Sequence, residues 1–332
     1  MHAPDGFLNA GTAVTTGAIS VGAIGASLRQ MRATLKDKQV PLAGLAAAFI
    51  FAAQMFNFPV AAGTTGHLLG GALAAILLGP FTGAVVVTVV VIVQAIGFAD
   101  GGLTALGYNV LNMAVVTAFG GFGIFRLLRR VLPANGTGVV VATGITAGLS
   151  VALSAMAFAL EWLFGATAPV PFDTVFGAMV GVHLLIGIGE GLISALVVGA
   201  VMASRPDLVY GARDLGREQA AQRPRVGMRG FVIAAGVVAL VFAAVVSQFA
   251  APDPDGLERV AEDQGFLAGG QEHALAGSPF ADYATEGLGN EAVSLAVAGV
   301  VGVAITLLVG LGVVAAVRDR GGRDVSTPTK AG

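Results

Sequence analysis

The chain has 332 residues, of which 55% are hydrophobic and only 11% charged, with a mean hydropathy of +0.83 and a formal net charge of −2. Soluble domains carry about 25% charged residues, so this composition excludes an ordinary soluble protein. The net charge is slightly negative, so no excess of basic residues indicates a nucleic-acid partner. The absence of cysteine excludes disulfides and thiolate metal sites.

The apolar segments predict an all-α polytopic membrane protein with about nine transmembrane helices, since one span takes about 20 apolar residues. In chain order the expected spans are 8–28, 41–58, 67–79, 80–98, 102–125, 138–164, 175–203, 230–249 and 292–317. The third is short, and Gly79-Pro80 predicts a tight turn or a broken helix before the fourth.

Basic residues predict the orientation of the spans. They follow the first, fifth, seventh and ninth spans, so that nine spans place all four groups on one side, and only Arg259 of 18 Lys and Arg falls on the other. The positive-inside rule makes that side the cytoplasm, with the N-terminus outside and the C-terminus cytoplasmic. The first apolar stretch has no preceding Lys or Arg, so we expect an uncleaved helix. The four groups are Arg29, Arg32, Lys36 and Lys38; Arg126, Arg129 and Arg130; Arg205, Arg213, Arg217, Arg223, Arg225 and Arg229; and Arg318, Arg320, Arg323 and Lys330.

Three parts are expected along the chain. Residues 1–203 form a seven-helix unit, residues 204–229 an Arg-rich cytoplasmic linker, and residues 230–332 a two-helix part with an outer loop over about 251–291. That loop is acidic, with Arg259 as its one basic residue. It is either a solvated loop, a mouth that attracts cations, or a surface that docks on the seven-helix unit.

The start of the chain is a candidate metal chelate. The free amine of Met1, the backbone nitrogen of His2 and the His2 imidazole can bind one ion through unstrained five- and six-membered rings. A fourth nitrogen from His67, in Gly63-Thr-Thr-Gly-His67, completes a planar N4 site, a geometry typical of Ni(II) or Cu(II). Because such ligands must lose their protons, affinity is expected to fall below about pH 6.5, the ordinary histidine pKa.

Other polar residues in or near the spans are expected to gather at the outer face, where they form a pocket around this chelate. His183 and Glu190 share one face of the seventh span, and Glu190 lies so deep that we expect a structural or coupling role for it rather than metal ligation. The candidate pocket residues are Gln54, Asn57, Thr64, Thr65, Asn109, Asn112, His183 and Glu190.

Several chemistries are absent from the sequence. It contains no G-x-x-x-x-G-K-[ST] phosphate loop, no H-E-x-x-H helix and no evident Ser/His/Asp constellation. The chain is therefore not expected to be an enzyme or its own ATP motor.

Several motifs carry a family resemblance. Met1-His-Ala-Pro-Asp-Gly-Phe-Leu8, Gln54-Met-Phe-Asn-Phe-Pro59, Gly63-Thr-Thr-Gly-His-Leu-Leu-Gly-Gly71, Gly107-Tyr-Asn-Val-Leu-Asn-Met-Ala114 and Gly181-Val-His-Leu-Leu-Ile-Gly-Ile-Gly-Glu-Gly191 resemble the CbiM/NikM family. These are substrate-specific components of energy-coupling factor (ECF) transporters for cobalt and nickel. Asp253-Pro-Asp-Gly-Leu-Glu258 and Ser278-Pro-Phe-Ala-Asp-Tyr283 resemble the small N component with its PDGLE domain. Ala3 and Tyr108 depart from the usual family residues.

The resemblance implies a function and partners. It implies that Met1, His2 and His67 bind Ni(II) or Co(II) as transported substrate, without a cofactor, in a prokaryotic cell membrane. It also implies a transmembrane coupling (T) component and two ATP-binding subunits as partners. The fused N part favours nickel by analogy.

Three alternatives remain open on the sequence. The chain could be a stand-alone divalent-cation channel or secondary transporter, to which the acidic loop lends support. It could be a membrane scaffold or sensor with a structural ion. It could also be the substrate component for an organic vitamin, against which stands the scarcity of aromatic residues, with one Trp and three Tyr.

Overall fold

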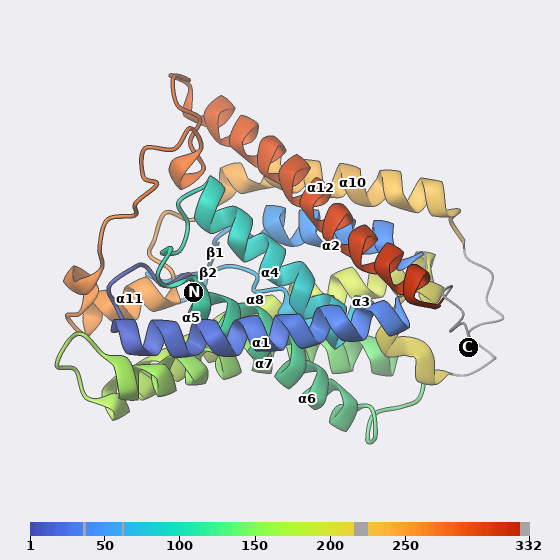
Figure 1. The fold of residues 1–332 in the computed structure, drawn as a ribbon, viewed down its shortest axis with the longest axis horizontal. Coiled ribbons are helices and arrows are strands. Elements are labelled where there is room, and N and C mark those ends of the chain that lie inside the picture. Colours follow the sequence, from blue (N-terminus) through green and yellow to red (C-terminus); the bar gives the residue numbers. More distant parts are fainter. Residues whose placement is uncertain (36–37, 62, 216–224, 326–332) are drawn as a thin grey trace, which may run out of the picture.

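The computed structural model describes residues 1–35, 38–61, 63–215 and 225–325. Within them the chain is an elongated all-α bundle, with one short antiparallel pairing of β1 (Phe58–Pro59) and β2 (Thr65–Gly66). The long helices run along the length of the molecule, and the N-terminal segment, the β pair and helix α11 (Gly256–Asp263) lie together at one end (Figure 1).

Seven helices of the described residues are long and apolar enough to cross a membrane, so the chain is a multi-pass membrane protein. The fifth of the predicted spans consists of α5 (Leu106–Val110), a π-helix (Leu111–Gly120) and α6 (Gly121–Leu128), which together run over Leu106–Leu128. The other six are α1 (Ala10–Thr34), α4 (Pro80–Gly97), α7 (Gly136–Gly165), α8 (Phe172–Ser204), α10 (Met228–Ala244) with its 3₁₀ extension Val246–Phe249, and α12 (Glu291–Val325).

The two remaining predicted spans form shorter helices. The segment 41–58 gives α2 (Gln39–Gln54), whose 16 residues span about 24 Å, and the segment 67–79 gives α3 (Gly71–Leu78), whose eight residues span about 12 Å. Gly70 and Gly79 have positive φ at the two ends of α3, and Pro80 begins α4. All eight residues of α3 are buried, so its apolar sequence serves packing inside the bundle.

Close helix contacts hold the bundle together. Helices α7 and α8 meet at facing glycines: a Cβ on Gly148 would lie 2.7 Å from the Gly187 carbonyl oxygen, so only glycine permits this approach. Helices α10 and α12 pack against α2, which joins the C-terminal hairpin to the rest of the bundle.

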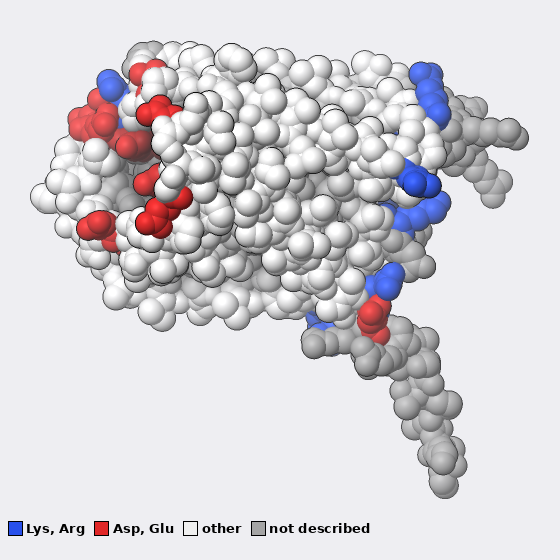
Figure 2. Space-filling view, turned by 90° about the horizontal axis from the view of Figure 1, so that it is seen from above, with Lys and Arg blue, Asp and Glu red and all other residues white. Residues whose placement is uncertain are grey.

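Charge separates the two ends of the molecule. Figure 2 shows Lys and Arg at the end opposite the N-terminal segment, and most Asp and Glu around a hollow at the other. Of the basic groups named above, Lys36, Arg217, Arg223 and Lys330 lie outside the described residues, as does residue range 216–224 of the expected linker.

The acidic segment between α10 and α12 folds over the end that carries the N-terminus. Backbone hydrogen bonds join Ala251 to Asn57 at 2.8 Å, Thr65 to Pro254 at 2.9 Å and Gln271 to Asp5 at 2.8 Å. This segment is therefore docked on the first part of the chain, as one of the three interpretations of the loop anticipated.

Candidate metal centre

The N-terminal segment is fixed before it reaches α1. The Asp5 carboxylate accepts backbone hydrogen bonds from Leu103, Thr104 and Ala105, at 3.1, 2.7 and 3.1 Å. Asn109 pairs with the backbone of Ala3 in both directions, at 3.0 Å each. These bonds fix the backbone around His2, so Asn109 supports the site without being a ligand.

The terminal amine is buried between two groups from distant parts of the chain. It lies 2.8 Å from His67 Nε2 and pairs with Asp255 Oδ2, which is itself 3.6 Å from His67 Nε2. Burial alone would raise the pKa of Asp255, but the charge of the ammonium holds that pKa well below its usual range. The metal-free site therefore contains an ammonium–carboxylate pair.

His67 presents a bare nitrogen to the amine. Its Nδ1 lies 3.1 Å from the Leu68 carbonyl oxygen, which only accepts hydrogen bonds, so Nδ1 donates and Nε2 carries the lone pair. Gly66, the preceding residue, has no room for a side chain because Ile186 of α8 lies against it. The ring is thus set in the tautomer that binds metal through Nε2.

His2 lies beside His67, with ring centroids 5.2 Å apart and planes inclined by 19°. Its Nε2 is 3.1 Å from Gln94 Oε1 and its Nδ1 is 3.3 Å from Asp100 Oδ1. Burial lowers the pKa of His2 to about 4, although Asp100 opposes the shift. His2 is therefore neutral at physiological pH, as a metal ligand must be.

Three of the predicted pocket residues support the loop that carries His67. Glu190 accepts hydrogen bonds from the backbone of Leu69 at 2.6 Å and Gly70 at 2.9 Å, and Gln54 donates to the Leu69 carbonyl oxygen at 3.0 Å. Thr65 donates to the Asp253 carbonyl oxygen at 3.0 Å and so joins the same loop to the acidic segment.

The remaining pocket candidates are Asn57, Thr64, His183 and Asn112, and each has different contacts. Asn57 lines the cavity described below, and Thr64 turns the chain between the two strands. His183 donates from Nδ1 to the Met179 carbonyl oxygen at 2.7 Å, and its Nε2 has no hydrogen-bond partner. Asn112 donates to Glu161 at 2.8 Å, within the bundle, and takes no part in holding the N-terminal ligands.

Sequence reasoning missed Gln94, Asp255 and Tyr283, and it did not count Asp100 among the site residues. One signal was available: Pro-Asp-Gly occurs at residues 4–6 and again at 254–256. Both aspartates accept backbone N–H groups, since Asp255 Oδ1 also caps α11 through Leu257 at 2.8 Å and Glu258 at 2.9 Å.

A cavity of about 900 Å³ leads to the buried histidines. Its polar lining is dominated by carboxylates, and burial followed by the charge of Asp255 raises the pKa of Glu258. Such a lining concentrates cations near the N-terminus. The acidic residues in the lining are Asp100, Asp253, Asp255, Glu258, Glu262 and Asp282.

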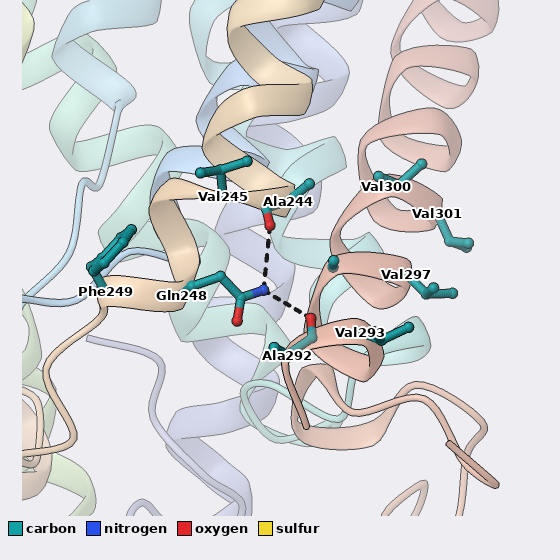
Figure 3. A pocket seen from close by; sticks show the side chains of 10 residues that line it. Ala244, Val245, Gln248, Phe249, Ala292, Val293, Val297, Val300 and Val301 are labelled. Atoms are coloured by element: carbon teal, nitrogen blue, oxygen red, sulfur yellow. Dashed lines mark hydrogen bonds between the residues drawn. The ribbon is translucent and has the colours of Figure 1, made fainter. Parts of the chain in front are cut away.

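A second hollow, of about 530 Å³, lies between α10 and α12 (Figure 3). Its polar side chain is Gln248, whose amide nitrogen already donates to the carbonyl oxygens of Ala244 at 3.3 Å and Ala292 at 2.9 Å. This groove offers nothing to a cation. It is lined by Ala244, Val245, Gln248, Phe249, Ala292, Val293, Ala296, Val297, Val300 and Val301.

The nitrogen atoms of the N-terminus and of His67 lie close together and form a candidate donor set for a metal. Across the described residues, no group of three or more His, Asp or Glu side chains is arranged to hold an ion. A site here needs the terminal amine and a backbone nitrogen in addition to imidazoles. Such a set of nitrogen donors suits late first-row metals such as Ni(II), Co(II) and Cu(II).

The site belongs to a multi-pass helical bundle with nitrogen atoms below an acidic cavity, and the family that it matches makes the protein a transporter component. The family model described as the cobalt uptake substrate-specific transmembrane region, CbiM, matches residues 2–208, and the PDGLE domain matches residues 229–319. The chain belongs to the CbiM family and carries a PDGLE domain after its substrate-specific region.

One named relative matches most of the chain, and two others match about as much of it as the CbiM region. Two are named fused nickel transport protein NikMN, the first of them as putative. That one, from Archaeoglobus fulgidus, is 34% identical over 310 residues, 93% of this chain and 97% of its own length. The one from Rhodobacter capsulatus is 38% identical over 221 residues, 63% of this chain and 64% of its own. The cobalt transport protein CbiM of Geobacter sulfurreducens is 34% identical over 218 residues, 63% of this chain and 61% of its own.

A solved structure shares the fold of the first part. The crystal structure of a truncated transition metal transporter matches with a TM-score of 0.54 at 32% identity, over 61% of this chain and 99% of that one. The fold is therefore that of a polytopic membrane transporter.

The Glu190 carboxylate provides a test of how His67 is held. In Glu190→Gln one of the two buried N–H groups at Leu69 and Gly70 loses its acceptor, so the loop shifts. We expect Ni(II) affinity, measured by calorimetry on the purified protein, to fall about tenfold, as for supports of metal ligands generally.

Glu161→Gln is the matched control, because Glu161 is also a buried carboxylate in a long helix but bonds Asn112. Equal losses of affinity in both variants would contradict a specific role for Glu190.

Proposed function

We propose that the chain captures Ni(II) or Co(II) in a planar N4 site. Its ligands are the Met1 amine, the His2 backbone nitrogen and Nδ1, and His67 Nε2. The observation that carries the proposal is the 2.8 Å contact between the amine and a His67 nitrogen whose ring is already fixed by Leu68. The names of the relatives, nickel and cobalt transport proteins, support the same substrate class.

Metal capture in this site is an exchange. The amine gives up its ion pair with Asp255, and His2 Nδ1, which lies beside Asp100, turns to the ion. The amine and the backbone amide each release a proton, because only their deprotonated forms bind the metal. The carboxylates remain beside the site and balance the charge of the ion.

The separation of charge supports an orientation. We place the acidic end with the N-terminus outside the cell membrane of a prokaryote and the basic end in the cytoplasm, by the positive-inside rule. In this arrangement α2 and α3 complete nine membrane-embedded segments. The parts are then a substrate component at 1–203, a cytoplasmic linker at 204–229 and an N component at 230–332.

The energy source in this proposal lies in other proteins. The sequence has no phosphate loop for ATP, and its family motifs resemble those of ECF substrate components. We therefore infer that a transmembrane coupling component and two ATP-binding subunits drive import. The acidic cavity also suits a stand-alone divalent-cation channel or secondary transporter, which is the second candidate.

The first test is metal stoichiometry and absorbance after loading with Ni(II). We expect one equivalent and a d–d band in the wild type, and loss of both in His2→Ala, in His67→Ala and in a protein with residues added before Met1. His273→Ala serves as control, because His273 lies in the acidic segment and bonds Leu275. Metal retained behind a blocked N-terminus would exclude the N4 site.

The dependence of affinity on pH provides a second test. Burial lowers the pKa of His2 to about 4, so protonation of His2 itself weakens binding only well below the ordinary histidine value of 6.5. The amine, which pairs with Asp255 as an ammonium, and the backbone amide each release a proton on binding. Competition with a chelator should therefore show affinity rising about a hundredfold per pH unit; a flat profile would contradict the mechanism.

Reconstitution distinguishes the two candidate functions. We expect liposomes with this chain alone to take up no Ni(II), and uptake to require co-reconstituted coupling and ATP-binding subunits with ATP. Loading the vesicles through a known ionophore checks that they retain the ion. Uptake by the chain alone would favour the channel or secondary transporter.

A further inference from the structure

A closed ring of four polar contacts surrounds the His2 imidazole. His2 Nε2 lies 3.1 Å from Gln94 Oε1, Gln94 Nε2 is 3.0 Å from the Tyr283 hydroxyl, and that hydroxyl is 2.6 Å from Asp100 Oδ2. Asp100 Oδ1 closes the ring, 3.3 Å from His2 Nδ1. Tyr283 comes from the PDGLE region, whereas the other three residues belong to the CbiM region.

Chemistry fixes the direction of each hydrogen bond in this ring. An ionised carboxylate only accepts, so the Tyr283 hydroxyl donates its single proton to Asp100. The Tyr283 oxygen must then accept from the Gln94 amide, which turns the Gln94 oxygen toward His2. His2 Nε2 therefore carries the hydrogen, and in a neutral ring Nδ1 is left with a bare lone pair. The fourth contact, between Nδ1 and Asp100 Oδ1 at 3.3 Å, then holds no hydrogen.

We propose that Tyr283 is a positioning residue that holds His2 in the tautomer whose Nδ1 is free to bind the transported ion. The inference rests on the proposed N4 site, in which Nδ1 of His2 is the ligand. It gives the PDGLE region a defined role, because this region then sets the proton position on a ligand of the other region without touching the ion.

The surroundings of Tyr283 fit this positioning role. Its ring stacks on Phe98 at 5.1 Å and lies 6.0 Å from Phe51, so the hydroxyl has a fixed position. Burial, and then the charge of Asp100, raises the pKa of Tyr283 well above its ordinary value, which keeps the hydroxyl a donor.

The backbone has unusual conformations where the CbiM and PDGLE regions meet near Tyr283. Among the described residues, positive φ outside glycine occurs at Ala99, Asp282 and Tyr283. The Asp282 amide donates to the Phe98 carbonyl oxygen at 2.9 Å, so the strained residues of the two regions meet there. Such conformations persist where the surrounding structure requires one particular side-chain placement.

Removing the hydroxyl frees the amide of Gln94. In Tyr283→Phe the ring and its stacking remain, but the Gln94 nitrogen loses its acceptor and can turn toward His2 Nε2. The ring hydrogen then moves to Nδ1, beside Asp100, and the ion must displace it. We expect Ni(II) affinity of the full-length protein in detergent to fall about tenfold.

Nitrogen NMR of the metal-free protein, labelled at histidine, provides a readout that loss of packing would not move. The wild type should show His2 protonated at Nε2, with the signals assigned by their loss in His2→Ala, and Tyr283→Phe should show Nδ1 protonation. Tyr210→Phe is the matched control, since Tyr210 packs on Phe122 near the opposite, basic end.

A second variant reaches the same tautomer by another route. Gln94→Met removes the acceptor of the Nε2 hydrogen while Tyr283 stays intact, so it should shift the tautomer in the same direction and also weaken Ni(II) binding. If either folded variant keeps the wild-type tautomer and affinity, the positioning role is overturned. Binding that survives His2→Ala would instead contradict the N4 site itself.

Discussion

The burial of the terminal amine is the constraint on which the rest of the site depends. An ammonium that is removed from water needs a partner, and Asp255 supplies it while His67 Nε2 lies 2.8 Å from the same nitrogen. Asp5 and Asn109 fix the first residues so that this contact can form. Three separate stretches of the chain therefore converge on the nitrogen of residue 1.

The terminal amine and the His2 ring, both proposed ligands, are each held through a residue of the PDGLE region. Asp255 holds the amine directly, and Tyr283 reaches His2 through Asp100 and Gln94. The docked acidic segment is thus part of the metal-free site, which gives a physical reason for the two regions to occur in one chain. In the proposed capture step the ion must displace contacts made by both regions.

The sequence identifies the residues that meet at the N-terminus better than it identifies the residues that support them. His2 and His67 follow from chelate chemistry and a motif, and basic residues predict which helix ends lie together. Asp255 and Tyr283 lie in a loop whose acidic composition is equally typical of a solvent-exposed loop. Their contacts join residues more than 180 positions apart, and no local sequence pattern predicts such contacts. Hydropathy likewise does not reveal that α3 is only eight residues long, because an apolar helix buried in protein resembles one buried in lipid.

Charge balance explains why a site of this kind suits only some cations. Without metal, the ammonium gives the proposed ligand set a charge of +1. A divalent ion that displaces one proton from the amine and one from the backbone amide leaves the net charge of the ligand set and ion at +1. The nearby carboxylates of Asp255 and Asp100 therefore face the same positive charge with and without the metal. Mg²⁺ and Ca²⁺ prefer oxygen ligands and do not displace an amide proton, so they would add charge to a buried site. Late first-row metals alone meet both the geometric and the electrostatic requirement.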